Sequence, residues 1–399
     1  MNTRHILLSV TALLAAVSLH AQTSELGQTK KNYISTGMPV LMIAPDAASS
    51  ALGDAGVASE PDAYSSHWNN AKYAFIRNDW GISTTYTPWL KKLGVGDMHL
   101  LYLGGYKRIN NRMTAAASIT YFSMGDIEKR NEFGDSQGNM HPNEFAIDLT
   151  FSMKLSEHFS MGASARLNHS DLTNGADVGN QTTKAANMIA ADLGFYYERS
   201  VENAQQFALG LLISNLGGKL SYSNDDTDKE FLPANLRLGG RYTKEFDESN
   251  KLNLLLDINK LLVATPPVQK TGESDADYRQ RYNDYRRMSS MESAFKALYD
   301  APRGFSEKLQ ELQISAGAEY WYRNFLAVRL GYFYENDNKG GRQYLTTGVG
   351  IRYKVFAIDF SYLVPTTNFN NNPLTNTIRI GLSVNFESQR ASVNDSRGV

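Results

Sequence analysis

The stretch Phe356-Ala-Ile-Asp-Phe-Ser-Tyr-Leu-Val364 places a large apolar residue at every second position. Ile358 and Phe360 therefore share one face with the terminal residues Phe356 and Val364. Asp359 lies on the other face. This is the period of a β-strand. Because the apolar face carries no charge over about nine residues, the segment is long enough to cross a bilayer as a tilted strand.

Neighbouring segments within residues 312–386 repeat this pattern. Their arginines, Arg329, Arg352 and Arg379, all fall on the face opposite the aliphatic one. The strands of soluble sandwiches are usually about five or six residues long, which is shorter than these segments. Tight turns alternate with longer polar loops such as 336–343. Short turns on one side and long loops on the other are typical of outer-membrane barrels.

The same alternation predicts further strands upstream, which brings the total to about fourteen. We therefore predict an all-β fold, a transmembrane antiparallel β-barrel with an N-terminal plug segment and long extracellular loops. The upstream strands are expected at 80–87, 97–107, 113–123, 145–155, 159–168, 189–198, 207–213, 235–243 and 252–259. The long loops are expected at 125–142, 170–184, 215–233 and 261–310, on the side opposite the turns.

The composition agrees with a barrel. Mean hydropathy is −0.39, too polar for a helical membrane protein, while 22 tyrosines suit the aromatic girdles of a barrel. A net charge of −1 gives no basic footprint for nucleic acid. Because the chain contains no cysteine, disulfides, thiolate metal sites and a lipoprotein anchor are excluded.

The N-terminus has the pattern of a secretory signal, with Arg4 before an apolar run at 6–19 and a cleavage site after Ala21. The run is too short to span a membrane as a helix. We expect a signal peptide at 1–21, a plug or periplasmic segment at 22–78, the outer-membrane barrel at 79–387 and a disordered periplasmic tail at 388–399.

The segment before the first strand is rich in Ala, Gly and Ser, which allows close packing against other backbone inside a barrel. Its candidate plug residues are Gly53, Gly56, Trp68 and Asn69. Small residues followed by Trp68-Asn-Asn-Ala71 resemble the N-terminal plug of the FadL-like outer-membrane proteins, which have proline at the position of Asn70.

Two further motifs, at 213–218 and 231–239, make the chain similar to the outer-membrane shuttle proteins of the type IX secretion system within that family. The resemblance implies a barrel that binds the C-terminal signal domain of secreted cargo proteins at the translocon. It also implies delivery to a cell-surface attachment complex, where cargo is joined to lipopolysaccharide. Outer-membrane lipid is the remaining expected partner. The alternative, from the wider family, is a channel for hydrophobic small molecules.

An enzyme is not expected. His169-Ser170 provides the residue types of an esterase, but adjacent residues of a strand point to opposite faces and cannot form a nucleophile and base pair. The histidines lack zinc-ligand spacing, and the acidic run at 225–228 is interpreted as a solvated loop rather than a calcium site. We expect no catalytic residues, metal or cofactor.

The longest loop contains a predicted helix at 276–299, with apolar residues every three or four positions. This stripe either packs the helix onto neighbouring loops or forms a surface for a protein partner, since Tyr, Met and Arg are enriched at interfaces. The candidate partner-binding residues are Tyr278, Arg279, Tyr282, Tyr285, Arg286, Met288 and Phe295.

Overall fold

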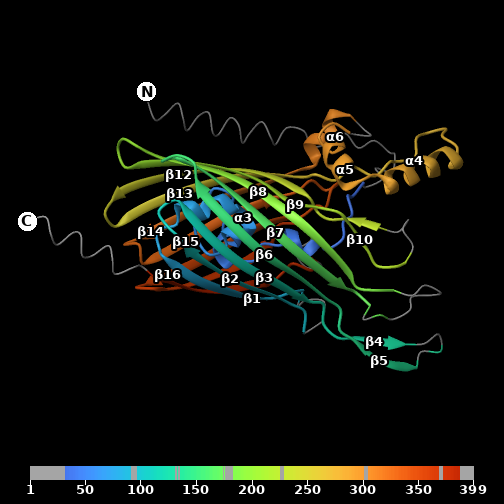
Figure 1. Cartoon of the computed structure of the whole chain (residues 1–399), viewed down its shortest axis with the longest axis horizontal. Coiled ribbons are helices and arrows are strands. Elements are labelled where there is room, and N and C mark those ends of the chain that lie inside the picture. Colours follow the sequence, from blue (N-terminus) through green and yellow to red (C-terminus); the bar gives the residue numbers. More distant parts are fainter. Residues whose placement is uncertain are drawn as a thin grey trace, which may run out of the picture. The chain divides into compact units, whose positions relative to one another are not determined.

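The computed structural model describes residues 32–90, 97–130, 133, 135–173, 175, 183–224, 229–300, 304–367 and 372–386. Within them, fourteen antiparallel strands hydrogen-bond in a ring and form a closed barrel (Figure 1). The barrel strands are β1 (Trp80–Pro88), β2 (His99–Arg108), β3 (Met113–Ser123), β6 (Asn143–Lys154), β7 (Phe159–Asp171), β8 (Ala186–Val201), β9 (Gln205–Gly217), β12 (Asn235–Asp247), β13 (Asn250–Leu261), β14 (Leu312–Tyr322), β15 (Leu326–Tyr334), β16 (Gln343–Tyr353), β17 (Phe356–Pro365) and β18 (Thr377–Phe386).

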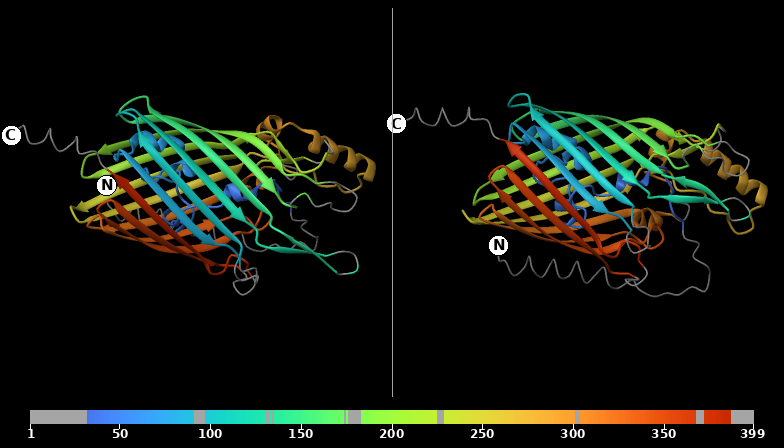
Figure 2. Two further views of the ribbon diagram at one scale, coloured as in Figure 1. Left: turned by 60° about the horizontal axis from the view of Figure 1, so that its bottom comes forward. Right: turned by 90° about the horizontal axis from the view of Figure 1, so that it is seen from below.

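Each barrel strand pairs with its neighbour along the chain, and the ring closes where β1 pairs with β18. This seam runs from Trp80 opposite Phe386 to Tyr86 opposite Ile380, and the two rings at its end, Trp80 and Phe386, stack with centroids 4.1 Å apart. Figure 2 shows the first and last strands side by side. The predicted barrel fold and its strand number are confirmed, including the strands expected at 97–107 and 207–213, which are β2 and β9.

The faces of the strands follow from the alternation in sequence. Along β17, Phe356 and Ile358 are exposed on the outside, whereas Ala357 and Asp359 are buried in the lumen. The same pattern, exposed and then buried, runs along β6 and β16. The outward face is therefore the continuous apolar surface that a bilayer requires.

Short turns and long loops separate to opposite ends of the barrel (Figure 1). Arg323 and Asn324 form the turn between β14 and β15 with positive φ values of 53° and 50°. Two of the long loops contain small hairpins that the sequence did not predict, β4 (Ile127–Arg130) with β5 (Ser136–Met140), and β10 (Lys219–Ser221) with β11 (Lys229–Phe231). We call the two ends of the barrel the turn end and the loop end.

Residues 38–78, here called the luminal segment, lie inside the barrel (Figure 1), whereas residues 32–37 run along the outer loops, where Gly37 N–H donates to Phe231 O at 2.9 Å. The luminal segment forms only short helices, η1 (Pro39–Met42), α2 (Ala47–Ser50), α3 (Ser65–Trp68) and η2 (Asn70–Phe75). At the loop end its Met38, Val40 and Leu41 pack with inward residues of the strands, including Leu100 and Phe122. Among the described residues, no helix is both long and apolar enough to cross a membrane.

The long loop between β13 and β14 contains α4 (Asp275–Arg287), α5 (Ser290–Lys296) and α6 (Phe305–Gln310). The prediction of one helix over 276–299 is wrong. Met288 has an extended backbone (φ −55°, ψ 138°), and the Ser289 side chain caps α5 by accepting a hydrogen bond from the Glu292 N–H at 3.1 Å. A serine in this role ends one helix and begins another.

Several predicted features lie outside the described residues. These are the signal peptide at 1–21, the acidic run at 225–228 and the C-terminal tail at 388–399.

Candidate functional site

Hydrogen bonds attach the luminal segment to strands around the barrel. The N–H groups of Gly56 and Val57 both donate to Asp257 Oδ2 on β13, at 2.7 and 2.8 Å. Three further bonds reach other strands. Gly53 N–H donates to Thr346 Oγ1 on β16 at 2.8 Å, and Tyr64 Oη bonds Thr85 Oγ1 on β1 at 2.8 Å. Asn70 Nδ2 donates to Ser164 Oγ on β7 at 2.9 Å. The segment is thus held from many directions by groups that would otherwise be buried without partners.

Inward-facing glycines of the strands let the segment approach the barrel wall closely. A Cβ on Gly162 of β7 would lie 2.6 Å from the backbone nitrogen of Ala71, and one on Gly317 of β14 would lie 2.7 Å from Leu52 Cβ. Gly331 of β15 lies against the backbone of Leu52 and Gly53, where an added Cβ would collide with Gly53 N. A larger residue at these positions would require the segment to move. These strand positions, which we call the luminal glycines, are Gly104, Gly162, Gly194, Gly210, Gly239, Gly317, Gly331, Gly348 and Gly381.

Three of the four candidate plug residues lie together in the lumen. The indole of Trp68 occupies the space that a side chain at position 56 would need, and its Nε1 donates to Asp46 Oδ1 at 2.6 Å. Asn69 donates to Val57 O at 3.2 Å and caps η2. Gly53 lies apart from them, against Tyr332 on β15, with a φ of +69° that favours glycine.

Buried ion pairs join the inward faces of neighbouring strands. Arg166 on β7 contacts Asp148 at 2.6 Å and Asp192 at 2.9 Å. On the opposite part of the wall, Arg329 contacts Glu319 at 2.7 Å. All are largely inaccessible to water, and removing one partner from such a group leaves an uncompensated charge, at a cost of about 3–5 kcal/mol.

The luminal segment adds its own charges. The Lys72 side chain is fully buried, and its Nζ donates to Gly56 O and Ser59 Oγ, both at 2.8 Å. Burial lowers the pKa of Lys72, and burial raises the pKa of Asp62 to about 6 although the Lys72 ammonium opposes that shift. Burial likewise lowers the pKa of His67, which favours the neutral imidazole.

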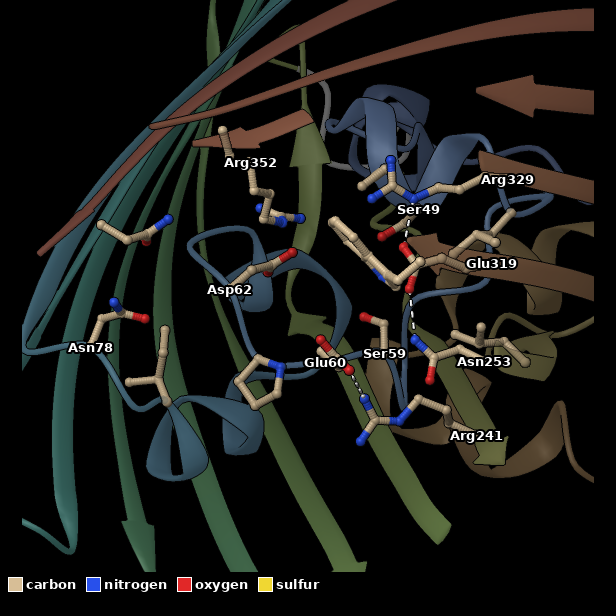
Figure 3. Close-up of a pocket in the computed structure, with 18 of the residues that line it drawn as sticks. Ser49, Ser59, Glu60, Asp62, Asn78, Arg241, Asn253, Glu319, Arg329 and Arg352 are labelled. Atoms are coloured by element: carbon tan, nitrogen blue, oxygen red, sulfur yellow. Dashed lines mark hydrogen bonds and ion pairs between the residues drawn. The ribbon is translucent and has the colours of Figure 1, made fainter. Parts of the chain in front are cut away.

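A polar pocket of about 250 Å³ opens near the turn end, and Figure 3 shows its lining. Glu60 of the luminal segment contacts Lys251 at 2.7 Å and Arg241 at 3.5 Å. Burial by itself would raise the pKa of Glu60, but Lys251 and Arg241 outweigh it and lower the pKa to about 2. The carboxylate therefore ties the segment electrostatically to β12 and β13.

The candidate partner-binding residues of α4 are accessible. Every residue of this helix is at least partly exposed, and Figure 1 shows the helix projecting from the loop end. Tyr278, Tyr282 and Tyr285 form a ladder with neighbouring ring centroids 6.2 and 6.1 Å apart. Only the last tyrosine of this ladder is anchored among the described residues, since Tyr285 packs on Phe231 with centroids 5.8 Å apart.

The remaining candidates divide between core and surface. Met288 is buried with Phe231 and Val263, so it packs the loop instead of forming its surface. The backbone carbonyl of Arg286 accepts a hydrogen bond from Lys219 Nζ at 2.7 Å, whereas Arg279 is exposed. Phe295 on α5 is 62 % exposed and lies apart from the tyrosine ladder.

His169 and Ser170 do not meet. Ser170 faces the lumen and its Oγ donates to Glu144 Oε1 at 2.8 Å, whereas His169 faces outward, stacks on Phe145 and bonds Asn187. Among the residues that the structure describes, no group of three or more His, Asp or Glu side chains is placed to hold a metal ion.

The luminal glycines are the main part of the site that the sequence analysis missed. A usable signal is present, because glycines recur at inward positions in the middle of one strand after another, as in Leu193-Gly-Phe195 and Leu330-Gly-Tyr332. A glycine carries no hydrophobic signal of its own, so the pattern emerges only after the strand faces are assigned.

A closed barrel with an apolar outer face and ion pairs in its lumen defines an integral β-barrel protein of the outer membrane. The chain belongs to the PorV family, since the family described as Type IX secretion system protein PorV matches residues 26–268. The predicted membership of a type IX secretion family is thereby confirmed. The protein is an outer-membrane component of that secretion system, and its family is one of transport rather than of enzymes.

Solved structures similar to this chain include three barrels. The toluene transporter TbuX of Ralstonia pickettii is 14% identical over 86% of this chain and 98% of its own, with a TM-score of 0.47. The Pseudomonas putida toluene transporter TodX is 13% identical over 86% of this chain and 99% of its own, with a TM-score of 0.48. A Pseudomonas aeruginosa FadL homologue is 10% identical over 89% of this chain and 97% of its own, with a TM-score of 0.41. No curated protein matches the sequence.

Proposed function

We propose that this protein carries secreted cargo by binding the cargo's C-terminal signal domain on its outer loops and delivering it from the translocon to the cell-surface attachment complex. Membership of the PorV family supports a role in type IX secretion. Short turns of outer-membrane barrels face the periplasm, so the loop end is the cell-surface end.

The observation that carries the proposal is the filled lumen. The luminal segment is bonded to strands on several sides, and at the luminal glycines it lies in close contact with the wall. In our proposal the segment acts as a plug, and cargo meets the protein at the loop end. The buried ion pairs of Arg166 and Arg329 oppose the alternative of a channel for hydrophobic solutes, because an apolar molecule would have to displace charged groups.

Helix α4 is the proposed contact with cargo. It projects from the loop end (Figure 1), its Arg279 and Tyr282 side chains are exposed, and tyrosine and arginine dominate binding energy at protein interfaces. A helix of 13 residues that is not packed along its length is marginally stable in water. Here the Ser274 cap, the tyrosine ladder and the anchor at Tyr285 hold it in place.

The test is a triple variant, Tyr278→Ala, Arg279→Ala and Tyr282→Ala. Purified barrel should lose about tenfold or more in affinity for an isolated cargo signal domain, since truncated interface hot spots cost over about 1 kcal/mol each. Cells with the variant should retain a heat-modifiable barrel but attach less cargo at the surface.

The matched control changes the opposite side of the same helix, Gln280→Ala, Asn283→Ala and Arg287→Ala, and should bind cargo normally. Normal binding by the tyrosine variant would remove α4 from the cargo site. Replacing 276–299 by a Gly/Ser linker then tests the whole loop, and normal cargo attachment by that variant would place the contact on 125–142 or 215–233.

A further inference from the structure

The polarity of α5, α6 and the residues around them is inverted. Ser293 is fully buried, and Glu307 and Glu311 are only 3% and 6% exposed. The small Ala294 and Ala297 are buried, whereas the large apolar side chains are exposed: these are Met291, Phe295, Leu298, Tyr299, Phe305 and Leu309, between 52% and 77% exposed. So many large apolar side chains on and between two short helices would be unfavourable in contact with water, and they therefore mark an interaction surface.

Helix α5 lies against the outside of the barrel. Its Ala294 packs with Leu262 and Ala234, and with Ile213 and Leu236 of the barrel wall. Leu236 precedes the lumen-facing Arg237 on β12, and Ile213 precedes the lumen-facing Ser214 on β9. Both apolar residues therefore belong to the outward face, and α5 covers that face near the loop end (Figure 1).

Charges are enclosed between these helices and the wall. Lys260 occupies an outward position near the end of β13, where it forms an ion pair with Glu311. Lys308 contacts Asp300 at 2.9 Å, and the Lys339 ammonium lies 2.7 Å from Glu307. The loop thus neutralises and covers an outward lysine that would otherwise face the bilayer, and it presents apolar residues in its place.

We propose that the surface of Met291, Phe295, Leu298, Tyr299, Phe305 and Leu309, here called the α5–α6 surface, is immersed in the outer leaflet of the outer membrane. Its occupant is lipid, at the boundary between headgroups and acyl chains, where amphipathic helices bind with their apolar face. The surface is continuous with the lipid-facing belt, since Ile213 and Leu236 lie directly beneath α5.

The aromatic residues fit this position. The strands β15 and β17 carry outward tyrosines near the loop end, Tyr334 and Tyr362, as barrels do at the membrane interface. Over β9, β12 and β14 the corresponding outward residues are aliphatic, Ile213, Leu236 and Leu312. Phe295, Tyr299 and Phe305 supply the aromatic girdle there. Phe295, predicted above as a partner-binding residue, is in this proposal a lipid contact.

The absence of cysteine allows a direct test by labelling one introduced thiol at a time. Leu298→Cys is compared with Leu256→Cys, on the lipid-facing side of β13, and Arg279→Cys, on α4. Each variant of the full chain carries an environment-sensitive fluorophore and is reconstituted alone into vesicles of phosphatidylethanolamine and phosphatidylglycerol. Fluorescence is quenched either by nitroxide-labelled lipid or by iodide in the water.

We expect the label at position 298 to lose as much fluorescence to nitroxide lipid as the label at 256, and to be protected from iodide. The label at 279 should show the reverse. If the label at 298 is quenched by iodide as strongly as the one at 279, the α5–α6 surface faces water in a membrane that holds no other protein, and the proposal is overturned in favour of a protein partner. Cargo binding plays no part in this measurement, so its result is independent of the proposed function.

Discussion

The carboxylate of Glu60 illustrates how single residues fix the luminal segment. It lies at the turn end of the barrel, 2.7 Å from Lys251 and 3.5 Å from Arg241, and its pKa of about 2 is below the ordinary 4.5. A carboxylate with a lowered pKa contributes stability above its ordinary pKa, and this contribution is lost as the pH falls through the folded value.

We therefore predict that Glu60→Gln destabilises the protein at neutral pH, and that the difference from wild type disappears between about pH 4.5 and 2. The loss should be below about 1 kcal/mol, because the Glu60 side chain is 45% exposed and solvent screens the pair. The effect is measured by thermal unfolding in detergent at several pH values in this range, with heat-modifiable gel migration as the readout of the folded fraction.

A double-mutant cycle with Lys251→Gln isolates the contact. If the two substitutions are additive at neutral pH, the ion pair contributes nothing and the interpretation of Glu60 as a tie is incorrect.

At the scale of elements, the strands and the luminal segment are fitted to each other through the luminal glycines. Gly331 on β15 lies against Leu52 and Gly53, so Gly331→Ala forces backbone apart in a packed interior. We expect a destabilisation of roughly 1–3 kcal/mol, as for other overpacking changes. The heat-modifiable transition temperature should fall accordingly.

Gly240 provides the matched control. It lies on the outward face of β12, where an added Cβ would be 3.6 Å from Leu209 Cδ2, an ordinary contact. Gly240→Ala should leave stability unchanged or slightly increased, since alanine restricts the unfolded chain. Equal losses for the two variants would show that strand glycines matter for the sheet itself rather than for the luminal segment.

The sequence predicted the strands well because a strand in a barrel wall has an uninterrupted period of two, with lipid on one side. It failed at the long loop for a related reason. The apolar spacing continues from Tyr285 through Met288 to Met291, although the chain is extended at Met288 and Ser289 starts a new helix. Apolar periodicity does not reveal where one helix ends and the next begins, and it does not distinguish a buried Met288 from an exposed Met291.

The sequence also could not predict which inward-facing side chains contact each other in the lumen. Alternation predicts that Asp148 and Arg166 face inward, but their contact depends on the register between β6 and β7, where these two residues are directly opposite. Asp257 is a further case, since its partners are backbone N–H groups of Gly56 and Val57, about two hundred positions away in the sequence. Contacts at that separation leave no local signature.

At the scale of the whole molecule, the luminal segment and the barrel wall form one packed unit, and this leads to a prediction about permeability. Deleting residues 38–71 should raise single-channel conductance in planar bilayers, because strands around the lumen lose the groups that fill it. The barrel should still form and show heat-modifiable migration, since the interstrand hydrogen bonds remain. A folded variant with unchanged conductance would mean that the outer loops close the pore.

The seam between β1 and β18 adds a consequence for biogenesis. The ring closes only when the last strand reaches the first, so residues as far apart as Ser83 and Ser383 meet in the final step of pairing. The luminal segment directly precedes β1 and is hydrogen-bonded to strands from many parts of the chain. A plug of this size cannot be threaded into a closed cylinder without breaking those contacts. We therefore expect the sheet to close around the luminal segment, so that residues 38–78 set the inner shape of the wall.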